Sequence, residues 1–250
     1  MKFIVEPNNG AWIAVRPELR KEALIERLTT ADILVSDLDD TDTPSPAKAI
    51  ARSGMLTPSY FKDPKFWLWA IGTKYHLARK GEGAESYRWS KFIETFLRDP
   101  EKLARLSEEY TPESAELKFY PGVRAFYNSL PLTLKVYLTR NIREVGEAYR
   151  RAAGFDEVLP EQFDKQKGIA KIVRAHPERK RFVIKGDSAE DEAVVDFLKS
   201  LKKKGEIEEV TPIYISNSPR NLNPRFDINI GRNYGGLVSL IMDPVPVQHA

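Results

Sequence analysis

One short stretch, residues 32–42, constrains the fold of this chain more than any other part of the sequence. It reads Asp-Ile-Leu-Val-Ser-Asp-Leu-Asp-Asp-Thr-Asp, an apolar run followed directly by acidic residues. The apolar run predicts a buried strand. The carboxylates of Asp37 and Asp39 then lie beyond its carboxyl end, where open α/β sheets bind ligands. Packed carboxylates repel one another, and a divalent cation or a shared proton relieves this repulsion. The stretch therefore predicts an α/β fold with a metal and acid–base site.

Two other interpretations are open when this stretch is taken alone. The acidic residues could form a turn that caps the following helix, because Asp is a favoured N-cap residue. Short Asp-x-Asp motifs also hold a metal ion in glycosyltransferases. The rest of the chain has to decide between these interpretations.

Composition excludes several kinds of site. The chain has 250 residues, 42% of them hydrophobic, which suits one large domain or a core with a smaller insert. It has no cysteine, so disulfides, a thiolate nucleophile and cysteine metal ligands are excluded. The histidines at positions 76, 176 and 249 are too far apart in sequence to indicate a zinc cluster. A net charge of +3 with interspersed signs gives no reason to expect a nucleic-acid partner.

The sequence shows no targeting or membrane segment. No apolar run approaches the ~18 residues of a membrane span, and the N-terminus lacks a signal-peptide pattern. We therefore expect a cytoplasmic protein with no membrane partner. Charged residues make up 30% of the chain and glutamine is sparse, as in heat-adapted proteins.

The segments on either side of the acidic stretch differ in character. Residues 2–5 and 11–15 predict a hairpin, and a helix is expected from Pro17 to about Thr30 as part of an N-terminal extension. Residues 45–118 instead show repeated helix starts, each an N-cap residue before proline. This segment predicts a helical insert whose aromatic residues form its own core. The pattern does not separate substrate contacts from packing at Tyr60, Tyr75, His76 and Tyr87.

From residue 119 onward, strand and helix patterns alternate, which predicts a parallel sheet with crossover helices. Strands are expected at 134–138, 155–159, 182–184, 211–215 and 226–229. Helices are expected at about 168–176, 189–204 and 233–242. Polar residues follow several of these strands, among them Thr139 and Asp187.

The polar residues at four segment ends occur in a recognisable order. They are Asp37-Leu-Asp39-Asp-Thr41, Thr139 after a strand, Lys167-Gly168-Ile169-Ala170, and Gly186-Asp187-Ser188-Ala189-Glu190-Asp191. In this order they resemble the haloacid dehalogenase (HAD) superfamily, over about 33–44 and 119–235. The resemblance implies a Rossmann-like core, residues 1–44 and 119–250, in which 1–30 form the extension. It also implies an all-helical cap domain inserted at 45–118.

The resemblance also implies roles for individual residues. Asp37 would be the nucleophile that forms an aspartyl-phosphate, and Asp39 the general acid and base. Thr139 would bind a phosphate oxygen, and a lysine would neutralise charge between Asp37 and the phosphate. Lys167 is preferred over Lys165 for that lysine because it directly precedes a glycine and a helix, as in the family.

The implied cofactor is Mg²⁺. Its ligands would be the carboxylates of Asp37 and Asp187 and the backbone carbonyl of Asp39, with Asp191 behind them, holding a water or orienting the inner ligands. Arg140 and Asn141, which follow Thr139, could reach the substrate or lie exposed.

The expected function is phosphatase activity on a small phosphorylated metabolite under a closing cap. The acid at Asp39 favours phosphomonoester chemistry, since the family's dehalogenases lack a carboxylate there. A phosphomutase is a close alternative, and a non-catalytic protein that binds a phosphate ligand is another. A receiver domain would be half as long and lacks the Gly-Asp-x-x-x-Asp turn, and nothing identifies the nucleotide-sugar site of a glycosyltransferase. The sequence determines neither the substrate nor the oligomeric state.

Overall fold

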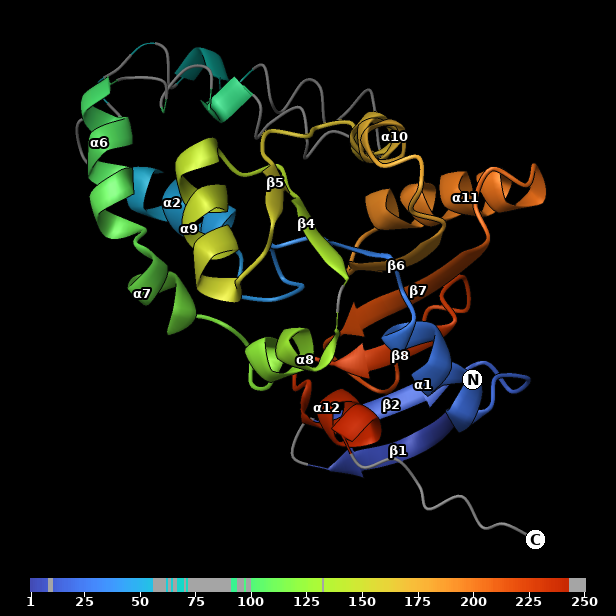
Figure 1. The fold of residues 1–250 in the computed structure, drawn as a ribbon. Helices are drawn as coiled ribbons and strands as arrows, with labels where there is room; N and C mark the ends of the chain where they lie inside the picture. Colours follow the sequence, from blue (N-terminus) through green and yellow to red (C-terminus); the bar gives the residue numbers. More distant parts are fainter. Residues whose placement is uncertain are drawn as a thin grey trace, which may run out of the picture.

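The computed structural model places the acidic stretch near the middle of one large sheet (Figure 1). It describes residues 1–8, 11–55, 62, 64, 67–69, 71, 91–93, 97, 100–131 and 133–242. Within this part of the chain, an eight-stranded sheet runs in the order β1-β2-β8-β7-β6-β3-β4-β5. The strand from the acidic stretch, β3 (Ile33–Ser36), lies between β6 and β4. This arrangement confirms the predicted α/β class.

The six strands β3 to β8 run parallel to one another, as the alternating pattern predicted. Their bounds are β4 Leu134–Leu138, β5 Glu157–Leu159, β6 Arg181–Gly186, β7 Glu209–Ser216 and β8 Ile228–Gly231. All four residues of β3 are buried, because helices cover both faces of the sheet and both sets of side chains face a core.

Side chains of β3 alternate between two helical layers. Ile33 and Val35 pack in a core with side chains of α10 and α11, whereas Leu34 packs in a second core with α1, α8, α9 and α12. The helix bounds are α1 Lys21–Thr29, α8 Val123–Ser129, α9 Arg143–Ala153, α10 Lys165–Ala175, α11 Ala189–Lys203 and α12 Gly235–Met242. The alternation continues past the strand end, so that Ser36 and Asp37 face opposite layers.

The N-terminal extension is part of the same sheet. β1 (Lys2–Asn8) pairs antiparallel with β2 (Ala11–Val15), and β2 pairs antiparallel with β8, with Ile13 opposite Ile230. The two strands thus add an antiparallel edge to the parallel core. The helix after them begins at Lys21 rather than Pro17, because the amide of Leu19 donates to the carbonyl of Arg16 in a preceding turn.

The described parts of the segment between β3 and β4 are helical where they form regular structure. They include α2 (Pro46–Met55), α6 (Pro100–Glu109) and α7 (Pro112–Glu116). Thr111 caps α7 ahead of a proline, as the sequence pattern predicted. The positions Tyr60, Tyr75, His76 and Tyr87 lie outside the described residues, and the division into core and cap stays a prediction. In the described part of the chain, no helix is both long and apolar enough to cross a bilayer.

Candidate active site

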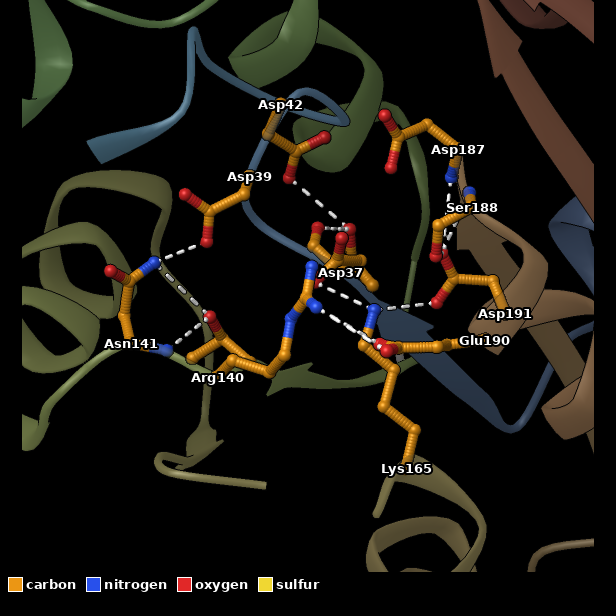
Figure 2. A network of polar contacts seen from close by, with 12 residues as sticks. Asp37, Asp39, Asp42, Arg140, Asn141, Lys165, Asp187, Ser188, Glu190 and Asp191 are labelled. Atoms are coloured by element: carbon orange, nitrogen blue, oxygen red, sulfur yellow. Dashed lines mark hydrogen bonds and ion pairs between the residues drawn. The ribbon is translucent and has the colours of Figure 1, made fainter. Parts of the chain in front are cut away.

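Strand ends bring the predicted site residues together at one edge of the sheet (Figure 2). Asp37 follows β3, Thr139 follows β4, and Asp187 follows β6. The amide of Asp37 still donates to the carbonyl of Lys185 on β6, at 3.0 Å. This bond carries the pairing of β3 and β6 one step further, so Asp37 and Asp187 leave the sheet as neighbours.

The loop after β3 folds back on itself. Asp40 has a φ of 57°, a left-handed conformation that Asp adopts more readily than most residues. The amide of Asp40 donates to the carbonyl of Thr43 at 2.8 Å, and that of Asp42 donates to the carbonyl of Leu38 at 3.1 Å. This tight turn keeps the side chain of Asp39 next to the strand ends.

Three carboxylates form a cluster that could hold a metal ion. Single oxygens of Asp37, Asp187 and Asp191 all lie within 4.8 Å of one another. Asp191 is fixed in place, because its Oδ2 accepts from the Ser188 hydroxyl at 2.6 Å and from the amides of Asp187 and Ser188. A Cβ atom on Gly186 would lie 2.1 Å from the Asp191 carboxyl carbon. Only glycine at this position lets Asp191 approach the end of β6.

Lys165, not Lys167, is the lysine of this cluster. Its buried Nζ lies 3.0 Å from Oδ1 of Asp37 and 2.7 Å from Oδ1 of Asp191 (Figure 2). The side chain of Lys167 is 81% exposed and pairs with Asp164 at 3.1 Å. The preference for Lys167 was therefore wrong.

The error came from where the helix begins. The sequence pattern suggested a start at Gly168, but α10 begins at Lys165 with Asp164 as its N-cap, whose side chain accepts from the amide of Lys167. Lys165 thus occupies the first helical position, facing the strand ends, and Lys167 turns to solvent. Asp164 was the signal that pointed to the correct helix start. Asp is a favoured N-cap residue, because its side chain accepts from an unpaired backbone amide in the first turn of a helix.

Burial dominates the electrostatics of the cluster. Burial, together with the carboxylates of Asp191 and Asp39, raises the pKa of Asp37 to about 7, although Lys165 acts in the opposite direction. Burial and the neighbouring Asp37 and Asp191 likewise raise the pKa of Asp187 to about 8. Burial lowers the pKa of Lys165, but Asp191 and Asp37 outweigh it and the pKa of Lys165 is raised. Lys165 therefore stays charged, whereas Asp37 and Asp187 are harder to ionise than ordinary carboxylates.

This donor set fits a hard divalent cation. Carboxylate oxygens are the ligands that Mg²⁺ prefers, and a cation placed among them would lower the raised pKa values of Asp37 and Asp187. Asp191 already uses Oδ1 for Lys165 and Oδ2 for Ser188. It is therefore suited to orienting the other ligands rather than to being the main donor.

Asp39 is held by two segments that differ from those of the cluster. Its Oδ1 accepts from the Ser45 hydroxyl at 2.6 Å and from the amide of Ala47, in the first turn of α2, at 3.1 Å. Its Oδ2 accepts from the side-chain amide of Asn141 (Figure 2). The side chain of Asp39 therefore links the loop after β4 to the start of the segment predicted to be the cap.

Of the residues after β4, Thr139 and Asn141 are buried and Arg140 is partly buried. Thr139 is inaccessible, and its hydroxyl oxygen accepts from the backbone amide of Asn141 at 3.1 Å. Arg140 forms an ion pair with Glu190 at 3.3 Å, with its side chain 20% exposed. Burial lowers the pKa of Arg140, but Glu190, Asp37 and Asp39 more than offset it, so its pKa is raised. Arg140 thus adds a fixed positive charge beside the cluster.

Three residues near the site, Ser45, Asn141 and Glu190, form contacts that were not assigned from the sequence. Ser45 could have been found, because Ser before Pro46 is a typical N-cap followed by proline at the first helical position. Asn141 was considered only for substrate contact or exposure. Its hydrogen bond to Asp39 joins residues 102 positions apart, so no local pattern in the sequence indicates it. The sequence around Glu190 gave no indication of its ion pair with Arg140, apart from its position between Asp187 and Asp191.

Comparison with solved structures shows which known fold this is. A haloacid dehalogenase-like hydrolase from Burkholderia xenovorans matches with a TM-score of 0.51 and 17% identity, over 83% of this chain and 98% of that one. A cytosolic 5′-nucleotidase IIIB bound to cytidine matches with a TM-score of 0.56 and 13% identity, over 94% of this chain and 95% of the nucleotidase. Neither a protein-family model nor a curated protein matches the sequence.

The molecule therefore has the fold of the HAD-like hydrolases, as the four motifs implied. At these identities the likeness concerns the fold.

Proposed function

We propose that this protein is a Mg²⁺-dependent phosphatase that hydrolyses a small phosphomonoester through an aspartyl-phosphate. The observation that carries the proposal is the placement of Asp37. It is buried at the end of β3, 3.0 Å from Lys165 and beside Asp187 and Asp191, with Asp39 held two residues further on. A nucleophile, a cation site and a separate acid are the parts that phosphoryl transfer through an aspartate requires.

In the first step, a carboxylate oxygen of Asp37 forms a bond to phosphorus and the bond from phosphorus to the substrate's alcohol oxygen breaks. Asp39 gives its proton to the departing oxygen, which leaves as an alcohol. Lys165 offsets the negative charge between Asp37 and the incoming phosphate, and the Thr139 hydroxyl and the Arg140 guanidinium bind phosphate oxygens. Lys165 is fixed by Asp191 before substrate arrives.

In the second step, water attacks the phosphorus of the aspartyl-phosphate. Asp39, now ionised, removes a proton from this water as the bond between phosphorus and Asp37 breaks. Inorganic phosphate leaves, and the carboxylate of Asp37 and the proton of Asp39 are restored. The same carboxyl group thus serves as acid and then as base, which is consistent with its separation from the nucleophile by a single residue, Leu38.

The carboxylates of Asp37 and Asp187 and the backbone carbonyl of Asp39 would hold Mg²⁺, with Asp191 orienting them. When bound, the cation would neutralise charge on the phosphate and reduce its repulsion with Asp37. The raised pKa values of Asp37 and Asp187 support this assignment, because burial first and then the neighbouring carboxylates disfavour their ionised forms, and a bound cation would offset both effects.

The solved structures of the same fold support a hydrolase with a small substrate. One is described as a haloacid dehalogenase-like hydrolase, and the other is a 5′-nucleotidase bound to cytidine. Asp39 favours phosphate esters over carbon–halogen bonds, since only an alcohol leaving group needs a proton.

The proposal is tested by assaying an aryl phosphate and a panel of small alkyl phosphates, including a nucleoside 5′-monophosphate, with Mg²⁺ or with a chelator. We expect hydrolysis that requires Mg²⁺. Asp37→Asn should lower kcat by at least about 10⁴-fold, and Asp39→Asn by about 10²- to 10⁴-fold. The Asp39→Asn loss should be larger for alkyl than for aryl phosphates, because an aryl alcohol needs less help from an acid.

Acid quenching during turnover should trap phosphate on the wild-type protein but not on Asp37→Asn. Return of the phosphoryl group to the product instead of to water would indicate a phosphomutase. Absence of hydrolysis across the panel, together with absence of a phosphoryl or metal-fluoride adduct on Asp37, would refute catalysis and favour a phosphate-binding protein.

A further inference from the structure

A row of polar side chains crosses three strands just below the candidate site. Ser36 on β3 pairs in register with Tyr137 on β4 and with Lys185 on β6. Each residue lies one or two positions before a site residue, respectively Asp37, Thr139 and Asp187. Leu34, two residues before Ser36 on the same face of β3, and Tyr137 itself pack in one core with side chains of α8 and α12. The row therefore lies on the face covered by α8 and α12, away from Lys165.

The acidic loop closes onto this row through Asp42. Its Oδ1 accepts from Nζ of Lys185 at 2.6 Å and from the hydroxyl of Tyr234 at 3.1 Å. Its Oδ2 accepts from the hydroxyl of Tyr137 at 2.9 Å, from that of Ser36 at 3.2 Å, and from that of Tyr127. A single carboxylate thus receives donors from β3, β4, β6, α8 and Tyr234, the residue before α12.

The pair at the centre is fully enclosed. The side chains of Asp42 and Lys185 are both 0% exposed. The ammonium group of Lys185 also lies over the rings of Tyr127 and Tyr234, at 4.5 Å and 4.6 Å from their centroids. Buried ion pairs often stabilise a fold no better than well-packed apolar residues of similar volume. Folding alone therefore gives a weak reason for a charged pair in this position.

The same contacts hold the loop that carries Asp39. The amide of Asp42 donates to the carbonyl of Leu38, and the single hydroxyl hydrogen of Tyr234 lies between Asp42 and the carbonyl of Thr41, whose oxygen is 3.0 Å from the Tyr234 hydroxyl. The main chain of Lys185 is also used, since its carbonyl accepts from the amide of Asp37. Asp42 and Lys185 thus tie together the segments that present Asp37, Asp39 and Asp187. In the part of the chain that the structure describes, neither side chain forms a hydrogen bond with the side chains of these three residues.

We propose that Asp42, Lys185 and the tyrosines at 127, 137 and 234 form a positioning layer that sets the separation of Asp37, Asp39 and Asp187. The layer acts on the site from the opposite face of the sheet. It is required for cation binding and turnover more than for folding. Its effect on turnover rests on the proposed phosphatase function. Its effect on the conformation of the loop at residues 38–43 does not.

The test replaces the charged pair by a neutral one, Asp42→Asn with Lys185→Met, which keeps an acceptor for the tyrosine hydroxyls. Mg²⁺ binding is measured by calorimetry, kcat and KM with a phosphomonoester, and the unfolding temperature by heating. We expect a folded protein whose Mg²⁺ affinity and kcat both fall by about 10- to 100-fold, as for other residues behind metal ligands. KM should change much less.

The matched control is a strand-linking ion pair remote from the site, Arg16 with Asp227 at 3.2 Å. Arg16→Met with Asp227→Asn should leave Mg²⁺ affinity and kcat unchanged. If the neutral Asp42/Lys185 variant is folded and keeps wild-type Mg²⁺ affinity and kcat, the proposal is overturned. If that variant does not fold, the milder Tyr137→Phe, which removes one donor to Asp42, decides in the same way.

Amide hydrogen exchange separates failure of this proposal from failure of the phosphatase function. If the positioning layer holds the loop, the amides of residues 38–43 exchange faster in the neutral variant, while those of β7 do not change. A wild-type protein that neither binds Mg²⁺ nor hydrolyses phosphate would refute the proposed function, and faster exchange in the variant would still support the positioning layer. Unchanged exchange at 38–43 would overturn it.

Discussion

Two buried lysines of this molecule differ in the charge that surrounds them. Lys165 lies against the carboxylates of Asp37 and Asp191, with Asp187 beside them. Lys185 lies against the one carboxylate of Asp42, and its other partners are tyrosine hydroxyls. The first cluster has more acids than bases, whereas the second has one of each. We infer that the unbalanced cluster is built to accept a cation and a phosphate, and the balanced one to hold its neighbours in place.

The pKa values of the two lysines reflect this difference. Burial lowers the pKa of both. For Lys185 the carboxylate of Asp42, with a smaller contribution from Asp37, does not overcome burial, and the pKa of Lys185 lies below its usual value. For Lys165 two carboxylates overcome it, and its pKa is raised. The same side chain, equally buried, is thus held more firmly in its charged form at the site where excess negative charge collects.

Removing the lysine of the unbalanced cluster should lower activity more than neutralising the balanced Asp42–Lys185 pair. We expect Lys165→Met to lower kcat by about 10²- to 10³-fold, comparable to the loss of a donor that stabilises a developing oxyanion. It should also lower the free energy of unfolding, because it leaves buried carboxylates without their base. Steady-state kinetics and denaturant unfolding at fixed Mg²⁺ measure both.

The matched control is Lys167→Met, two residues further along the same helix. Lys167 is exposed and pairs with Asp164, so this variant should keep kcat within about twofold and unfold like the wild type. If Lys167→Met were the damaging variant, the placement of Lys165 at the first position of α10 would be wrong.

The buried carboxyl groups of Asp37 and Asp187 should also make the free energy of unfolding depend on pH and on Mg²⁺. The pKa of Asp37 is raised from 3.8 to about 7 and that of Asp187 from 3.8 to about 8, so the folded state binds protons more tightly than the unfolded state. This contribution to stability is fully present below about pH 4 and is lost as pH rises to about 8. With a chelator, the unfolding temperature should therefore fall across this window.

Mg²⁺ should offset this loss at pH 8, by about 2.7 kcal/mol at a concentration 100 times its Kd, and much less at pH 5, where protons compete for the carboxylates. Asp37→Asn should make the chelated protein less sensitive to pH between 4 and 8. Thermal unfolding in a pH series, with and without Mg²⁺, measures both effects. An unfolding temperature that rises from pH 5 to pH 8 in chelator would contradict the charge imbalance.

Local sequence patterns predicted the acids of the unbalanced cluster but not its geometry. Asp37, Asp39, Asp187 and Asp191 were identifiable because each follows directly from a strand end or lies within one helical turn of it. The lysine was misassigned because the choice depended on whether α10 begins at Lys165 or at Gly168, and the two ends are the least regular parts of a helix. A shift of three residues moved one lysine to solvent and brought the other to the site.

The balanced cluster could not be predicted from local patterns at all. Asp42 looks like one more acid of the loop, and its pairing with Lys185 joins residues 143 positions apart. It requires the left-handed turn at Asp40 and the parallel pairing of β3 with β6. The attachment of the N-terminal hairpin to β8 is similar, since it joins Ile13 to Ile230. Such contacts follow from the whole fold.

The smallest effect is expected from a change in charge at the edge of the Lys165 cluster. Glu190 pairs with Arg140 at 3.3 Å, and both are partly buried. Glu190→Gln removes one negative charge next to the cluster while keeping the shape of the side chain. We expect phosphate to inhibit about two- to fivefold more strongly, because Arg140 loses a competing charged partner, and Mg²⁺ to bind more weakly by a similar factor.

The opposite signs make this test informative, because a general loss of structure would weaken the binding of both ions. Glu192→Gln is the matched control, since Glu192 lies on the same helix and pairs with Arg225 instead, at 3.2 Å. Phosphate inhibition and Mg²⁺ calorimetry on both variants would decide. If phosphate and Mg²⁺ affinities shifted in the same direction in Glu190→Gln, or equally in Glu192→Gln, net charge would not be what separates the Lys165 cluster from the Lys185 cluster. The difference between the two clusters would then have to lie in their hydrogen-bonding geometry.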